Sequence, residues 1–420
     1  MQEIYYLHYD CTSNLIDLFC LKFQLTLSIV SKQYQYIFTH VIRFESKCNI
    51  PIKIINKFKN VSYLNLKNDN KLLKLNEFNY LHTLSIGTKC KLTSLNICKH
   101  LTYLYLNNSK IKDINHLINL KILHLIDSNI STIHCLNDLN TLYLHNSPIR
   151  YINDNVNLTS LEIIVQNNSN KLENMNLFFN FCMNSENIER IDNLSKLIFL
   201  RLENISRKIF SHGYHLRNLT QLYIRYLQHD FQSVNTFQHA NLEYDRICKL
   251  KILKITHCLN PDIMLLNNLI HLHLDYCEIY VPLDYLTNLK TLSCTGVLFS
   301  YKIHNSSITQ LMLNYAPSSY YEIEYLPSLK SLIYHGCKKY FCIIRGFEHL
   351  ISLHDLRLEY YDTGSLDISS LTNLTSLSLT SCKTIKDVNL LTRLKMLKTS
   401  DTKVINSAMN GRNRRMIGPR

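Results

Sequence analysis

The stretch Leu101-Thr-Tyr-Leu104-Tyr-Leu106, which continues through Ser109 and Ile111 to Ile114, decides the fold of this chain. The same phrase returns as Leu120-Lys-Ile-Leu123-His-Leu125, as Leu139-Asn-Thr-Leu142-Tyr-Leu144 and, much later, as Leu374-Thr-Ser-Leu377-Ser-Leu379. The first central leucines stand at positions 104, 123, 142 and 161, a constant step of 19 residues. A short phrase at a fixed period is typical of a solenoid, in which each repeat stacks on its neighbours.

Each copy has two parts with different periods. The alternation of Leu104 and Leu106 has period two, which predicts a short strand whose leucines point inward. The following Ile-x-x-Ile segment has period three and indicates a tight helical or extended return on the outer side. A repeat of this length leaves no room for a long outer helix. One repeat cannot bury its own apolar face, so we expect the copies to stack.

This pattern closely resembles the leucine-rich repeat family, above all its short intracellular class, which reads Leu-x-x-Leu-x-Leu-x-x-Asn-x-Ile-x-x-Ile. The resemblance extends over residues 41–402 and is specific because the phrase recurs about 17 times. It implies an α/β solenoid, a horseshoe with one curved parallel β-sheet and a short helical N-terminal cap. Two stretches break the period, at residues 164–196 and 226–247, and each is either an insertion or a degenerate repeat. Residues 403–420 form a basic tail that we expect to be disordered.

The chain departs from the family pattern at the Asn position. Here the site is occupied by Ser109, Ser128 and Ser147, and later by Cys258, Cys277, Cys337 and Cys382. In the family this side chain points inward and bonds to the backbone of the turn, and a hydroxyl or thiol can do so more weakly. The resemblance therefore implies that these cysteines are structural.

Residues 1–40 do not fit the repeat. The apolar positions from Leu15 to Phe38 favour a helix, and one interpretation is a cap that shields the first repeat. A second interpretation comes from a resemblance to the latter half of an F-box, Leu-x-x-x-Ser-x-Val-Ser-Lys-x-Trp/Tyr, carried by Leu25, Ser28, Val30, Ser31, Lys32 and Tyr34. The first leucine is one position too near, and the family's opening Leu-Pro-x-Glu is missing. The resemblance implies a hook for the adaptor subunit of a cullin-type ubiquitin ligase, with the repeats selecting the substrate.

The polar positions between the inward leucines face the other way, because side chains alternate along a strand. They predict a partner-binding surface on the concave face, made of Tyr103, Tyr105, His124, Tyr143, His145, Arg201, Tyr223, Arg225, Lys254, His271, His273 and Asp275. Tyrosine and arginine make strong contacts at protein interfaces, so we expect a protein partner. His271, His273 and Asp275 have a spacing that a metal ion could use, but such positions are polar by default, and we predict no metal site.

Charge and composition set the remaining expectations. The formal net charge is +14, and Arg412, Arg414, Arg415 and Arg420 supply four of these charges. A basic solenoid that binds nucleic acid is therefore an alternative, although lysines spread over solvated faces account for the charge equally well. No secretion signal or membrane span is visible, which predicts an intracellular, cytoplasmic protein, with a nuclear location open through the basic tail. Because no phosphate loop, nucleophile elbow or Cys-x-x-Cys pair occurs, we predict a non-enzymatic protein without cofactors.

Overall fold

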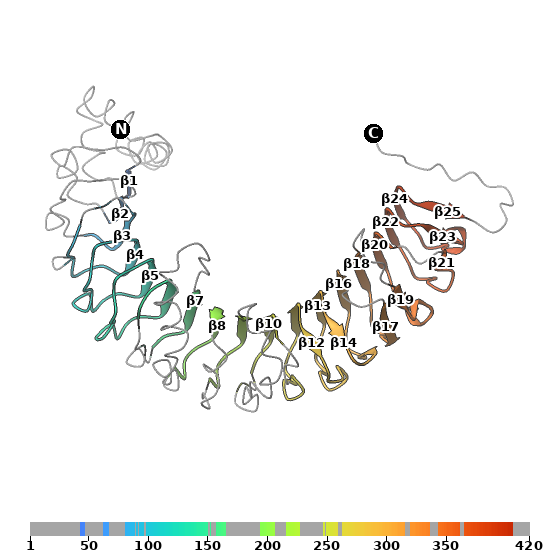
Figure 1. The fold of residues 1–420 in the computed structure, drawn as a ribbon, viewed down its shortest axis with the longest axis horizontal. Coiled ribbons are helices and arrows are strands. Elements are labelled where there is room, and N and C mark those ends of the chain that lie inside the picture. Colours follow the sequence, from blue (N-terminus) through green and yellow to red (C-terminus); the bar gives the residue numbers. More distant parts are fainter. Residues whose placement is uncertain are drawn as a thin grey trace, which may run out of the picture. The chain divides into compact units, whose positions relative to one another are not determined.

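The computed structural model describes residues 43–46, 62–66, 80–149, 152, 157–164, 194–205, 216–226, 247–258, 263–315, 320–336, 343–361 and 365–405, apart from residues 89, 91, 96, 97 and 248. The chain divides into two compact units, Met1–Asn218 and Leu219–Arg420. Each unit is a parallel β-solenoid in which successive strands lie side by side in chain order (Figure 1). The repeated phrase thus folds as a leucine-rich repeat solenoid, as its period predicts.

The described residues of the first unit form eight parallel strands, each paired with the next along the chain. They are β1 Arg43–Ser46, β2 Tyr63–Leu66, β3 Thr83–Ile86, β4 Tyr103–Asn107, β5 Ile122–Ile126, β6 Thr141–His145, β7 Ser160–Ile164 and β8 Phe199–Ile205. The central leucines lie in register, so that Leu104 pairs with Leu123 and Leu123 with Leu142.

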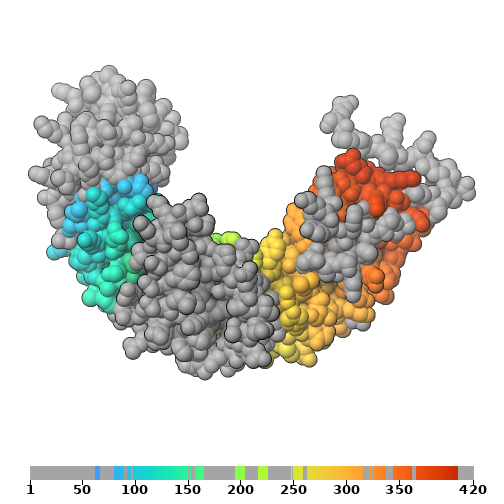
Figure 2. Space-filling model, viewed as in Figure 1, coloured from blue at the N-terminus to red at the C-terminus, as the bar shows by residue number. Residues whose placement is uncertain are grey.

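The second unit has the same plan, and its described part contributes nine parallel strands to the main sheet. They are β9 Gln221–Tyr226, β10 Ile252–Thr256, β11 His271–Asp275, β13 Thr291–Thr295, β16 Gln310–Asn314, β18 Ser331–His335, β20 Asp355–Glu359, β22 Ser376–Thr380 and β24 Met396–Ser400. In Figure 2 the described residues of this unit run from yellow-green to red along the chain.

The return segments of the second unit carry short strands of their own. They are β12 Glu278–Ile279, β14 Leu298–Phe299, β15 Ile303–His304, β17 Tyr320–Tyr325, β19 Ile343–Arg345, β21 Ser365–Asp367, β23 Thr384–Lys386 and β25 Lys403–Ile405. Two single 3-10 turns, η8 Phe347–His349 and η9 Val388–Leu390, interrupt them. The Ile-x-x-Ile return is therefore extended or a single tight turn, and no α-helix occurs among the described residues.

Alternation along the main strands builds the core. In β4 to β7 each inward residue is buried and each outward residue is partly exposed. Leu104, Leu123 and Leu142 are fully buried, and so are Ile111 and Ile130 from the return segments. Stacked repeats remove both sets of aliphatic side chains from water, which supplies most of the stability of such a fold.

A residue in the left-handed conformation follows many of the strands, a feature that the leucine pattern does not predict. Asn108, Asp127 and Asn146 have positive φ, and each donates its backbone N–H to the last residue of the following strand. The donor of Asn108, for example, lies 2.8 Å from the Ile126 carbonyl oxygen. Asparagine and aspartate tolerate this conformation better than most residues. Their recurrence after Leu-x-Leu-x was the signal that could have identified the turn.

The Ser and Cys position behaves as the family resemblance implies. Ser109 Oγ accepts a hydrogen bond from Ile111 N–H at 3.2 Å, and Ser128 Oγ does the same for Ile130. Cys277 Sγ donates to the carbonyl oxygens of Asp275 and Ile255 at 3.3 and 3.6 Å. Cys258 and Cys382 are buried as well, whereas Cys337 lies outside the described residues.

Burial should make these thiols unreactive in the folded protein. Desolvation raises the pKa of Cys277, and it raises that of the fully buried Cys294 strongly, so both stay protonated at neutral pH. The thiolate is the nucleophile, and we therefore expect iodoacetamide to alkylate the exposed Cys135 in the native chain and to spare Cys277 and Cys294. Peptide mass spectrometry before and after urea unfolding measures this. Equal labelling of Cys135 and Cys277 under native conditions would contradict the burial.

Some predicted segments fall mostly or wholly outside the described residues. The head of residues 1–40, including Leu25, Ser28, Val30, Ser31, Lys32 and Tyr34, is among them, as are most of 164–196 and 226–247. Of the predicted tail, residues 403–405 form β25, which pairs in parallel with β23. The described part of the chain contains no helix that is long and apolar enough to cross a membrane.

Candidate functional site

The structure places all twelve predicted surface residues on outward positions of main-sheet strands. The first unit carries Tyr103, Tyr105, His124, Tyr143, His145 and Arg201, and the second carries Tyr223, Arg225, Lys254, His271, His273 and Asp275. They alternate with buried leucines and isoleucines, so their outward direction follows from the strand period. The two sets belong to separate units.

Four of these residues in the first unit form a row of rings. We call Tyr103, Tyr105, His124 and Tyr143 the ring row. The His124 ring stacks between Tyr103 and Tyr143, with centroid separations of 5.4 and 5.3 Å, and it also contacts Tyr105 at 6.1 Å. Strand register makes Tyr105, His124 and Tyr143 paired positions of β4, β5 and β6, and Tyr103 reaches the His124 ring diagonally from the position paired with Ile122. Stacking at these separations is favourable and restrains the orientation of the rings.

The ring row is electrically neutral at physiological pH. Burial lowers the pKa of His124, so its imidazole is uncharged at pH 7. Burial is also the largest cause that raises the pKa of Tyr103 and of Tyr143, which keeps both phenols protonated. The row therefore offers apolar ring faces with polar edges and no net charge.

An ion-pair group continues the sheet face beyond the ring row. The Arg201 guanidinium on β8 lies 3.0 Å from Glu162 Oε1 on β7, and its Nε donates to Glu203 Oε1 at 2.8 Å. Burial raises the pKa of Glu162, and the nearby Arg201 charge opposes that shift. His145, on β6, has a buried Nε2 without a hydrogen-bond partner.

The second unit has its own polar group on β10 and β11. His273 Nε2 lies 2.9 Å from Asp275 Oδ1, and Lys254 Nζ lies 3.7 Å from Asp275 Oδ2. Burial raises the Asp275 pKa, but hydrogen bonding and charge from His273, the Lys254 charge and the Thr295 hydroxyl together lower it below its usual value. Within the described residues, no group of three or more His, Cys, Asp or Glu side chains is placed to hold a metal ion.

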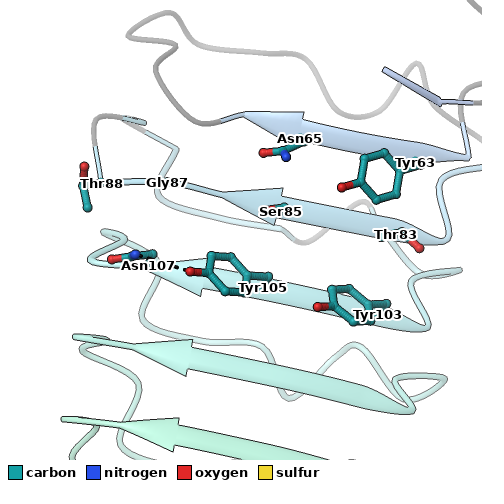
Figure 3. A pocket seen from close by; sticks show the side chains of 9 residues that line it. All are labelled: Tyr63, Asn65, Thr83, Ser85, Gly87, Thr88, Tyr103, Tyr105 and Asn107. Atoms are coloured by element: carbon teal, nitrogen blue, oxygen red, sulfur yellow. Dashed lines mark hydrogen bonds between the residues drawn. The ribbon is translucent and has the colours of Figure 1, made fainter. Parts of the chain in front are cut away.

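Sequence reasoning missed a depression on the exposed face of β2 to β4, next to the ring row. It has a volume of about 640 Å³, and its lining includes Tyr63 and Asn65 of β2, Ser85 of β3, and Tyr103, Tyr105 and Asn107 of β4. Figure 3 shows these side chains on three successive strands, with Asn107 bonded to the Tyr105 hydroxyl. The copy Val61-Ser-Tyr63-Leu64-Asn65-Leu66 follows the repeat phrase, so the pattern that pointed to the ring row could also have identified Tyr63 and Asn65 as outward positions.

Comparison with known proteins supports the fold. No protein-family model and no curated protein matches the sequence. Among solved structures, the leucine-rich repeat protein LIC12759 of Leptospira interrogans is 18% identical, with 87% of this chain and 89% of that chain covered and a TM-score of 0.49. InlJ of Listeria monocytogenes is 16% identical, with 88% and 70% covered and a TM-score of 0.44. A chain of the Toll–Spatzle complex of Drosophila is 12% identical, with 89% and 55% covered and a TM-score of 0.52. The Drosophila chain, with a TM-score above 0.5, shares the fold, and at 12% identity the likeness shows the fold alone.

Proposed function

We propose that this chain is a non-enzymatic protein-binding scaffold, which holds a protein partner on the exposed strand face of its leucine-rich repeats. The observation that carries the proposal is the ring row, in which His124 stacks between Tyr103 and Tyr143 across three neighbouring strands. Tyrosine gives a large contact area and loses little conformational entropy on binding, which makes it a frequent anchor at protein interfaces. The solved structure of Drosophila that shares the fold is itself a complex, Toll–Spatzle.

Electrostatics favour a protein partner over nucleic acid. Arg201 and Lys254, two of the three cations among the predicted surface residues, lie within ion-pair distance of Glu162 and Asp275. A cation that already has a carboxylate neighbour releases fewer counterions when it meets a phosphate. The basic-solenoid alternative predicts binding that falls steeply with salt, and absence of binding at low ionic strength would remove it.

Loss of two tyrosines should release the partner. We expect the variant Tyr105→Ala/Tyr143→Ala to lose its specific partner in quantitative affinity purification, because hot-spot side chains each cost about 2 kcal/mol or more when truncated. The matched control is Tyr80→Ala/Tyr285→Ala, which removes two exposed tyrosines that lie outside the strands. If both double variants retain or lose the same protein equally, the strand face is not the binding surface.

The ubiquitin-ligase version remains a more specific form of the proposal. It would make residues 1–40 the hook for the cullin-ligase adaptor and the ring row part of the substrate site. The same purification, repeated with a chain that lacks residues 1–40, tests it. The adaptor should appear with the full chain only, whereas recovery of the same partners and no ligase subunit with either form contradicts it.

A further inference from the structure

Asn65 lies on the outward face of β2 but is buried. The outward residues at the same position of the next two strands, Ser85 and Tyr105, are partly exposed. The Asn65 side chain is only 6% exposed, and its Oδ1 has no hydrogen-bond partner. A buried amide oxygen without a donor is costly, and such atoms in native proteins require an explanation. Figure 3 shows Asn65 on β2 within the depression, beside Tyr63 and across from Tyr105 on β4.

The surroundings of Asn65 define what could bind there. The described residues that line the depression are tyrosine, asparagine, serine, threonine and glycine, and none of them carries a charge. Among these described lining residues a carboxylate would find no cation, and it would meet the acceptor oxygen of Asn65. A lysine or arginine would find no carboxylate among them to replace its water, and the chain as a whole already carries +14. The lining therefore selects a neutral group that donates a hydrogen bond.

We propose that this depression is a socket for a side-chain amide, Asn or Gln, of the protein partner. The inference rests on the proposed function, because it names the group by which that partner is recognised. A ligand amide donates its N–H to Asn65 Oδ1 and offers its own oxygen to the donors of the site, such as the Asn65 amide and the Ser85 hydroxyl. The Tyr63 and Tyr103 rings give its planar face an apolar surface.

Two further features favour a peptide over a small ligand. Tyr103 and Tyr105 belong both to the depression and to the ring row, so an occupant longer than the socket continues over His124 and Tyr143. A mixture of Tyr, Ser, Asn and Gly is also the composition of binding surfaces that recognise proteins. A neutral sugar satisfies some of the same hydrogen bonds, and it is an outcome of the test below.

The test selects binders from a random linear peptide library displayed on phage, with the full chain as target. We expect the selected peptides to share an Asn or Gln. Their affinity should fall about tenfold when Asn65 is replaced by Leu, or when the peptide amide is replaced by Leu or Met. Asn65→Leu combined with the altered peptide should lower the affinity little more than either change alone, since both changes remove the same interaction. Asn314→Leu, the same change on the strand face of the second unit, should leave the affinity unchanged.

We expect the Asn65→Leu variant to fold, because leucine replaces an unpaired buried amide with a side chain of similar shape. The thermal unfolding midpoint of the variant tests this expectation. Asn65→Asp should shift the selected peptides from amides to Lys or Arg. Selected peptides without an amide, or an affinity insensitive to Asn65→Leu, would overturn the socket. If such peptides still require Tyr105 and Tyr143 for binding, the socket fails but the proposed function stands. If they require neither tyrosine, the proposed function fails as well. Failure to select any peptide, or binding of N-acetylglucosamine oligomers instead, also overturns the socket.

Discussion

Replacement of Gly346 by alanine is expected to destabilise the second unit by roughly 3 kcal/mol or more. Gly346 precedes η8 with φ 95°, a conformation that side-chain-bearing residues rarely adopt. A Cβ at this position would lie 1.9 Å from the Ile323 carbonyl oxygen and 3.0 Å from its carbon. That oxygen belongs to the backbone of β17, which is paired with β19, so it cannot move aside without breaking the small sheet.

Gly296→Ala is the matched control for this prediction. Gly296 also has positive φ, but its added Cβ would meet the Tyr276 ring at 2.7 Å, and that ring is 52% exposed and can rotate away. We therefore expect a cost of only about 1–2 kcal/mol, that of the left-handed conformation alone. Urea unfolding measures both variants, and hydrogen exchange of the β17 and β19 amides locates the effect. An equal loss of unfolding free energy in Gly346→Ala and Gly296→Ala would mean that contact with β17 does not constrain Gly346.

Replacement of Leu123 by alanine should cost the first unit about 2–5 kcal/mol, the range for a buried leucine that leaves a cavity. Leu123 is fully buried at the centre of β5, and in register its neighbours are Leu104 and Leu142. Neither neighbouring strand can close the gap, since each is held by its own hydrogen bonds to β5.

The adjacent residue provides the control. Ile122 is a similar aliphatic side chain one position away, but it points outward and is partly exposed. Ile122→Ala should cost about 1 kcal/mol or less, as for surface substitutions. The comparison is read from the urea midpoints of the two variants. A larger loss for Ile122 than for Leu123 would indicate a register shifted by one residue, which exchanges the two faces of a strand.

The sequence predicts the parts of this fold that depend on local pattern. The spacing of Leu104 and Leu106 identifies both the strand and its buried face, because an alternation of two can satisfy only one sheet surface. The fixed step between copies predicts that they stack, and the family resemblance implies both the parallel sheet and the inward turn positions of Ser109 and Cys277. The outward direction of Tyr105, His124 and Tyr143 follows from the same pattern.

The contacts among outward side chains were decided by the tertiary structure. His124 meets Tyr103 and Tyr143 because strands whose residues lie far apart in sequence come into register, and no local pattern encodes the angle between their rings. Pairing of Arg201 with Glu162 depends likewise on β7 lying next to β8, although residues 165–198 separate the two strands in sequence. Asn65 is the sharpest case: its strand position predicts partial exposure, yet the structure buries it and leaves its oxygen without a donor. Burial is a property of everything that surrounds a side chain, and for Asn65 that surrounding exists only once the neighbouring strands are assembled.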